Sequence, residues 1–394
     1  MLRRGFDREI ILPDFSNVRG VNYIPTYPSV WADPPELPGN LEFVGIASSV
    51  AIWRFYTSGD VDQQLGWLRG LGVNTLRVWL NHAVWEHDER ECRARGGSNA
   101  FLDHFAELLA LASKHALYVM PILWDELFVE PSNTPFDDIT VWVRNPASAK
   151  VNLAWASDPS DPYNGDEYVK AVVRIGRQSE ALAMWDIMNE PGQHDAWLRH
   201  YCDLVRQHDP NPAHKITIGN AALTPFGGAL TAAALDQPTL DVLSYHPYGM
   251  FRQNVQAWTG LARQVSQPPF TDRPKPILAT EGGNPGEAQR YDDFLAYCSE
   301  VRVGSMPFQA MIGRGKFIFG DGQGMLYDDG EMRFEQDAVA LRGLGRHQGR
   351  LYLELRDTLQ KGDLAGFLAP FLPNGFGVDA LLRQLHPLAW PGRA

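Results

Sequence analysis

The stretch Ala183–Gly192 reads AMWDIMNEPG. A short apolar run ends on Asn189 and Glu190, and a proline and a glycine follow. Glutamate is almost never fully buried unless it is paired. This carboxylate therefore either marks the place where a strand reaches the surface or is directed by the strand at a substrate, and the rest of the chain decides between the two.

The chain alternates short apolar, β-rich runs with longer amphipathic runs. This alternation predicts βα units and a parallel sheet. Eight such units in one chain of this length predict an α/β fold of the (β/α)8 TIM barrel type. The expected strands are Asn17–Ile24, Val73–Leu80, Leu117–Trp124, Ala181–Met188, Lys215–Gly219, Leu240–His246, Pro276–Thr280 and, as the candidate eighth, Pro307–Gly313.

The amphipathic runs predict the helices of these units. In FLDHFAELLALASKH (Phe101–His115), for example, apolar residues recur every three or four positions, as on one face of a helix. The expected helices are Asp60–Leu71, Phe101–His115, Glu167–Gln178, His194–His208, Gly228–Leu235, Val255–Val265, Gly286–Val301 and Phe334–Leu344.

No linker or low-complexity tract divides the sequence, so we expect one catalytic domain over residues 1–394. The barrel is expected from about residue 17 to 345. A long polar, proline-rich loop, Asp125–Pro162, follows the third strand, and a C-terminal extension over residues 346–394 exceeds what the barrel needs. We expect this extension to pack on the barrel.

Charge and cysteine content narrow the classes of function. A formal net charge of −12 argues against nucleic acid or an anionic membrane surface as partner. The three cysteines are far apart and have no metal-binding spacing, and no phosphate-binding loop follows a strand, so no metal or cofactor is expected. The N-terminus lacks the apolar segment of a signal peptide, which predicts a cytoplasmic protein. The oligomeric state stays open.

Polar residues gather at the expected strand ends, where TIM barrels carry their active sites. Glu190 follows the fourth strand, and Glu281, in PILATEGG, follows the seventh. The two carboxylates are therefore expected to face one mouth of the barrel. The other polar residues expected at similar depth are Arg77 within the second strand, His82 after it, Asp125 after the third, and His246 and Tyr248 after the sixth.

Two carboxylates with these neighbours are suited to glycoside hydrolysis. One carboxyl group must be protonated to release the leaving oxygen, and the other must be ionised to attack the anomeric carbon or to activate water. An arginine beside one carboxylate lowers the pKa of that group and keeps it ionised. The negative field of the ionised group then raises the pKa of its partner.

The segments LGVNTLRVWL, WDIMNEP, SYHPYG and ATEGG, in this order, resemble glycoside hydrolase clan A, and most closely the cellulase-like glycoside hydrolase family 5. The resemblance covers roughly residues 17–344. It implies a barrel of retaining enzymes in which Glu190 is the acid/base and Glu281 the nucleophile. It further implies that Asn189 binds the sugar 2-OH and that Arg77 steadies the nucleophile.

The same resemblance places His246 and Tyr248 along the sugar subsite nearest the reaction. Three positions depart from the family pattern. A glycine follows the nucleophile where the family has an aromatic residue, Trp124 and Asp125 end strand three where the family has a histidine, and Phe308 stands where strand eight usually supplies a tryptophan. These changes keep the carboxylate chemistry and alter the walls of the sugar site. The further candidates for substrate binding are His82, Trp124, Asp125 and Phe308. For Trp124, stacking on a sugar and packing in the protein are both open.

The sequence thus predicts a retaining O-glycoside hydrolase that acts by double displacement on a β-linked oligosaccharide or small glycoside. The long loop after strand three favours exo action. Two alternatives remain: a catalytically silent carbohydrate-binding barrel, and a metal-dependent isomerase or lyase barrel. The sugar and its linkage are left open.

Overall fold

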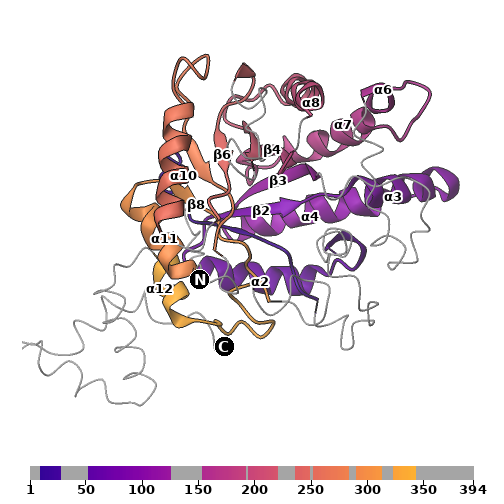
Figure 1. The fold of residues 1–394 in the computed structure, drawn as a ribbon. Coiled ribbons are helices and arrows are strands. Elements are labelled where there is room, and N and C mark those ends of the chain that lie inside the picture. The colour runs from indigo at the N-terminus through magenta and orange to yellow at the C-terminus, as the bar shows by residue number, and fades with distance from the viewer. Residues whose placement is uncertain are drawn as a thin grey trace, which may run out of the picture.

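The computed structural model describes residues 9–27, 52–125, 153–191, 194–220, 236–248, 252–283, 290–312 and 323–342. Eight parallel strands form one sheet in the order β1 to β8 (Figure 1). A parallel bridge between Arg19 and Ser305 links the first strand to the last, which confirms the predicted TIM barrel. The strands are β1 (Gly20–Asn22), β2 (Thr75–Trp79), β3 (Tyr118–Asp125), β4 (Met184–Asn189), β5 (Lys215–Asn220), β6 (Leu243–Tyr245), β7 (Ile277–Ala279) and β8 (Gly304–Ser305).

Helices cover the outside of the barrel, between successive strands (Figure 1). None of those described is long and apolar enough to cross a membrane. Most of the described helices lie where the sequence predicts them. The full set of described helices is α2 (Ser58–Gly70), α3 (His82–Arg95), α4 (Ala100–Lys114), α6 (Leu153–Ala156), α7 (Gly165–Gly176), α8 (Asp195–His208), α10 (Arg252–Val265), α11 (Tyr291–Glu300) and α12 (Glu335–Leu341).

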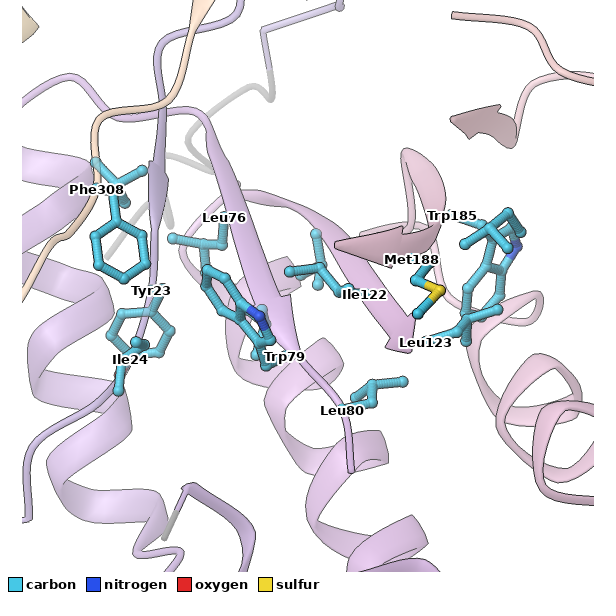
Figure 2. Packing of buried hydrophobic residues seen from close by; sticks show 14 of the residues in the cluster. Tyr23, Ile24, Leu76, Trp79, Leu80, Ile122, Leu123, Trp185, Met188 and Phe308 are labelled. Carbon is cyan, nitrogen blue, oxygen red and sulfur yellow. The ribbon is translucent and has the colours of Figure 1, made fainter. Parts of the chain in front are cut away.

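The core forms two layers. The larger one packs the strands against the outer helices, and Figure 2 shows part of it around Leu76, Ile122 and Trp185. At the end of α7, a Cβ on Gly176 would lie 2.3 Å from the Trp185 ring, so a glycine lets this helix pack closely on β4.

A smaller apolar cluster comes from residues in or beside six of the strands. Met184 belongs to it and lies two residues before Asp186, so both side chains point to the same side of the sheet. This cluster is therefore the floor beneath the polar residues of the barrel. Its buried members are Phe15, Val18, Met120, Met184, Val242, Leu278 and Met306.

The predicted position of strand eight was wrong. The strand is Gly304–Ser305, ahead of the apolar run at 307–313. Pro307 has no N–H to donate to a ladder, and the following residues are buried by another route: the backbone of Ala310 accepts hydrogen bonds from Met325 and Leu326. The segment makes an isolated bridge between Met311 and Leu326, and its described residues extend no strand of the sheet.

Two helices were missed: the four-residue α6, inside the stretch expected as a loop, and the longer α3. α3 follows β2 directly and is mostly polar, without the apolar periodicity used to find the other helices. Several expectations lie outside the described residues: the helix at 228–235, the start of the helix at 286–301, most of the loop at 125–162, and the extension at 346–394.

Candidate active site

Glu190 and Glu281 lie together at the carboxyl ends of the strands. Glu190 follows β4 in a left-handed conformation (φ 46°), and its backbone N–H donates to the Gly219 carbonyl at 2.7 Å. Glu281 follows β7. One oxygen of each carboxylate and one ring nitrogen of His246 all lie within 4.8 Å of one another. Non-glycine residues rarely adopt positive φ, and such strain is most common at functional sites.

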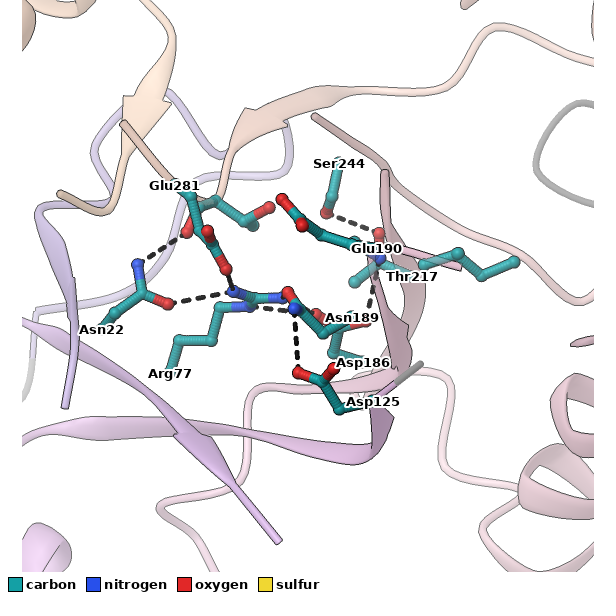
Figure 3. Close-up of polar contacts among 12 residues, drawn as sticks. Asn22, Arg77, Asp125, Asp186, Asn189, Glu190, Thr217, Ser244 and Glu281 are labelled. Carbon is teal, nitrogen blue, oxygen red and sulfur yellow. Dashed lines mark hydrogen bonds and ion pairs between the residues drawn. The ribbon is translucent and has the colours of Figure 1, made fainter. Parts of the chain in front are cut away.

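Arg77, on β2, is the centre of the hydrogen-bond network beneath these carboxylates (Figure 3). The side chain is fully buried. Nε and Nη2 donate to Asp186 Oδ2 at 3.0 and 2.8 Å, and Nη2 also donates to Asn189 Oδ1 at 2.6 Å. Nη1 donates to Asn22 Oδ1 at 3.0 Å and to Glu281 Oε1. These contacts match the five N–H donors of the guanidinium group.

Asp186 was missed by the sequence analysis. It lies on β4 with its side chain fully buried, and its Oδ1 accepts the Gly219 N–H at 2.9 Å. Burial raises the pKa of Asp186, and Arg77 opposes that rise. A Cβ on Gly219 would lie 2.6 Å from Arg77 Nη2 and 2.9 Å from Asp186 Oδ2, so this position of β5 has no room for a side chain. Asp186 stands inside β4, two strands from the buried Arg77 of β2, and an aspartate within a barrel strand beside a buried arginine was the available signal.

Glu281 receives two strong donors. Arg77 donates to Oε1, and the Tyr248 hydroxyl donates to Oε2 at 3.0 Å. Burial, with the Glu281 charge in second place, raises the pKa of Tyr248 well above its usual value, so the hydroxyl keeps its proton. Hydrogen bonds and a cation both favour the ionised form of a carboxylate.

Glu190 has a different environment. Its side chain is 31% exposed at the mouth, where a substrate oxygen could reach it. Among the described residues, only His246 hydrogen-bonds to its carboxyl group, with Nδ1 2.8 Å from Oε1. Burial raises the pKa of Glu190, and the Arg77 charge only partly opposes this rise. A raised pKa is what a catalytic acid needs near neutral pH.

His246 is neutral. Burial lowers its pKa to about 3, Arg77 acts in the same direction, and Glu281 opposes both. Its Nε2 has no hydrogen-bond partner in the described part of the chain and faces the same space beside Gly219 as the Arg77 guanidinium. A nearby cation favours an unprotonated nitrogen, so we assign the single proton of the ring to Nδ1, beside Glu190.

Asn189 is locked in one orientation. Its Oδ1 accepts from Arg77, and its Nδ2 donates to Asp125 Oδ2 at 2.9 Å. The same Asp125 oxygen accepts the indole N–H of Trp79 at 2.9 Å. Asp125, predicted to bind substrate, therefore touches the network directly and fixes the amide that lies beside Glu190.

Phe308 borders the site from the segment after β8. Its ring packs edge-on against Trp79 with centroids 5.7 Å apart, and its N–H donates to the carbonyl of Gly282. A Cβ on Gly282 would lie 2.5 Å from the Phe294 ring, and one on Gly283 would lie 2.3 Å from Tyr291. Close packing of α11 thus accounts for the glycines after Glu281.

His82 and Trp124 lie elsewhere. They stack on each other with centroids 5.6 Å apart, in an aromatic cluster that joins β3 to α3, α6, α7 and α8. His82 Nε2 lies 3.0 Å from the Tyr163 carbonyl, and only 4% of the Trp124 surface is exposed. The described contacts link neither residue to the carboxylates. The cluster comprises His82, Trp85, Trp124, Trp155, Tyr168, Trp197 and Tyr201.

Glu190, His246 and Glu281 are also the one set of three potential metal ligands in the described part of the chain. Arg77 already supplies a cation to Glu281, and a metal ion placed between these groups would be repelled by the guanidinium. The geometry therefore favours a carboxylate pair arranged for proton and glycosyl transfer.

Sequence comparisons give no family. The chain matches no model of a known protein family and no curated protein. Structural comparison finds GH5_18 from Streptomyces cattleya, solved with GlcNAc, with a TM-score of 0.57, 17% identity, and coverage of 84% of this chain and 80% of that one.

A second similar structure is GH5_18 from Bifidobacterium longum, solved with Manβ1-4GlcNAc, with a TM-score of 0.56, 13% identity, and coverage of 86% and 78%. A third is an exo-β-1,4-mannosidase from Opitutaceae bacterium strain TAV5, with a TM-score of 0.54 and 17% identity. The alignment covers 84% of this chain and 59% of the mannosidase. At these identities the similarity establishes a shared barrel fold.

Proposed function

We propose that this protein is a retaining β-glycosidase with Glu281 as the nucleophile and Glu190 as the acid/base. The observation that carries the proposal is the contrast between two neighbouring carboxylates. Arg77 and Tyr248 donate to Glu281, whereas burial raises the pKa of Glu190, whose one hydrogen-bond partner among the described residues is the neutral His246. When the environments of two neighbouring titratable groups push their pKa values apart, the group with the higher pKa is assigned as the acid and the other as the ionised partner.

The separation of the two groups supports retention. Retaining enzymes hold their carboxyl groups about 5–5.5 Å apart, whereas inverting enzymes need about 6.5–9.5 Å to admit a water molecule. Oxygens of Glu190 and Glu281 lie within 4.8 Å of each other. This spacing suits direct attack by Glu281 on a sugar carbon.

The reaction then has two displacements. An oxygen of Glu281 bonds to the anomeric carbon as the bond to the leaving oxygen breaks, and the Glu190 proton moves to that oxygen. Glu190, now ionised, takes a proton from water while the water oxygen attacks the anomeric carbon. The ester bond breaks, Glu281 recovers its charge, and two inversions give net retention.

The substrate is proposed to be a β-mannoside or a related neutral β-glycoside. Asn189 supplies the fixed amide, and its second Nδ2 hydrogen is available for the sugar 2-OH because Arg77 and Asp125 hold the rest of the group. The names of the structural neighbours make mannosides the first sugars to test. Exo action stays part of the proposal and depends on the loop at 125–162.

The proposed function is tested with a panel of nitrophenyl pyranosides and furanosides that includes the β-mannopyranoside. We expect hydrolysis that survives chelator treatment, with the β-anomer appearing first in proton NMR spectra. An α-anomer as first product would contradict retention. Tight sugar binding without turnover would favour the silent binding barrel, and loss of activity on chelation would favour the metal-dependent alternative.

The pH dependence of kcat/KM should be a bell. Activity falls on the acid side as Glu281 takes up a proton, and on the basic side as Glu190 loses its proton. Because burial raises the pKa of Glu190, the acid stays protonated above the usual range of a glutamate, so the basic limb should lie above pH 4.5. His246, with a pKa of about 3, should contribute no limb near neutrality. A basic limb unchanged in Glu190→Gln would contradict the assignment.

A further inference from the structure

Asp186 lies on the opposite side of Arg77 from Glu281. It accepts two of the five guanidinium hydrogen bonds, whereas Glu281 accepts one. Both Arg77 and Asp186 are fully buried, and the apolar floor around Met184 lies on the same side of the sheet. Low polarity strengthens every charge interaction in this layer.

The charge of Glu281 changes during the proposed reaction, but that of Arg77 does not. When Glu281 forms an ester with the sugar, its negative charge disappears. An arginine paired with Glu281 alone would then be a lone buried cation, which is strongly unfavourable. Asp186 leaves Arg77 neutralised in both states. It also limits how far the guanidinium charge withdraws electron density from the Glu281 carboxylate.

We propose that Asp186 is a positioning residue for glycosyl transfer, which holds Arg77 against Glu281 and balances its charge while the glycosyl-enzyme forms. The proposal rests on the function proposed above. It requires Asp186 to act through Arg77, since its other hydrogen bonds come from the backbone N–H groups of Gly219 and Met188. Gly219 lacks a side chain at the point where a methyl group would push this pair apart.

The other charged and titratable groups around Glu281 come from several elements. Arg77 approaches from β2, His246 and Tyr248 from the segment after β6, and Glu190 from the end of β4. Asp186→Asn leaves all of these in place and removes one negative charge. Any shift in the titration of Glu281 can then be traced to Asp186 and Arg77.

In Asp186→Asn we expect the acid limb of kcat/KM to move to lower pH by about one unit. Arg77 then forms an ion pair with Glu281 alone, and its charge favours the ionised form of Glu281 more strongly. At the pH optimum, kcat/KM should fall about 10- to 100-fold, because the ionised Glu281 carboxylate is then more strongly stabilised by Arg77 and is a weaker nucleophile. Hydrolysis of the glycosyl-enzyme should not slow, because Glu281 becomes a better leaving group. An equal fall at every pH with an unmoved limb would overturn the proposal.

Two further variants separate charge from packing. Asp186→Glu keeps the ion pair and should retain the wild-type acid limb with reduced kcat/KM. It also tests the proposal if the asparagine variant does not fold, because a shifted limb in this variant would contradict a role for charge. Asp209→Asn removes another buried carboxylate, which accepts the Trp185 indole N–H at 2.8 Å. It should lower the melting temperature without moving the limb.

A carboxyl 13C NMR titration provides a readout that does not need activity. The Glu281 signal, assigned by its loss in Glu281→Gln, should titrate at lower pH in Asp186→Asn than in the wild type. If the wild type hydrolyses no glycoside and this midpoint still moves, the proposed function fails while the coupling stands. An active wild type with an unmoved midpoint would overturn the coupling alone.

Discussion

Glu281→Ala should abolish turnover of every glycoside that the wild type hydrolyses, including those with activated leaving groups. Glu281 accepts hydrogen bonds from Arg77 and Tyr248, and in the proposed mechanism no other group bonds to the anomeric carbon. Loss of the nucleophile should lower kcat by a factor on the order of 10⁵. The measurement is release of dinitrophenolate from the best substrate in the panel, with mass spectrometry to detect any glycosylated protein.

Loss of folding should not account for this result. Removing Glu281 leaves Arg77 paired with Asp186, so no lone buried cation remains. The variant should therefore unfold cooperatively and still bind sugar. Asp209→Asn, which removes a buried acid outside the site, should lose stability and keep its activity. A Glu281→Ala protein that retains a tenth of wild-type kcat with an unchanged KM would remove Glu281 from the mechanism.

The barrel could be predicted because its signal is repeated along the chain. Short apolar runs alternate with longer amphipathic runs along the sequence, so an error in one unit leaves the others intact. Strand eight shows the limit of the pattern. The run at 307–313 has the composition of a strand, but its residues 307–311 are buried beside the segment around Met325. Burial is encoded in the sequence more clearly than pairing.

Helix α3 was missed for the opposite reason. It is strongly polar and is supported by ion pairs four residues apart, such as Glu86 with Arg90 and Glu89 with Arg93. Such pairs stabilise helices without an apolar stripe. The run EHDERECRAR contained this signal. A search for charge spacing as well as apolar spacing would have found it.

The candidate residues at strand ends could be predicted, as could Arg77 within β2, whereas Asp186 within β4 could not. Glu190, Glu281, His246 and Tyr248 all follow strands and do meet in space. Asp186 lies inside a strand, where neither period nor composition separates a buried acid from an outward one. Only the knowledge that Arg77 is fully buried calls for a second carboxylate.

The aromatic residues show a related ambiguity. His82 and Trp124 lie near strand ends, where both sugar stacking and packing were open. In the structure, Trp124 faces the helix layer and contacts Trp197 and Tyr201 of α8. Asp125, the next residue, turns into the site and binds Asn189. Adjacent residues of a strand point to opposite faces of the sheet. A shift of one position therefore moves a side chain from the helix-facing core into the active site.

Glu190→Ala should separate the two proposed steps. Without the acid, substrates with poor leaving groups should lose about 10²- to 10⁴-fold in kcat/KM. A dinitrophenolate leaves with little protonation, so such a substrate should still glycosylate Glu281. The intermediate then lacks its base and should accumulate, visible as a burst of phenolate and as a mass increase on the protein.

Azide should restore turnover in Glu190→Ala, because this anion needs no general base and fits the space that the missing side chain leaves. Its attack inverts the anomeric carbon of the intermediate a second time, so the product should be a β-glycosyl azide from a β-glycoside. Glu190→Gln fills the same space with an amide and should show little rescue. An α-glycosyl azide from Glu190→Ala, or azide rescue in Glu281→Ala instead, would mean that the two carboxylates have the opposite roles.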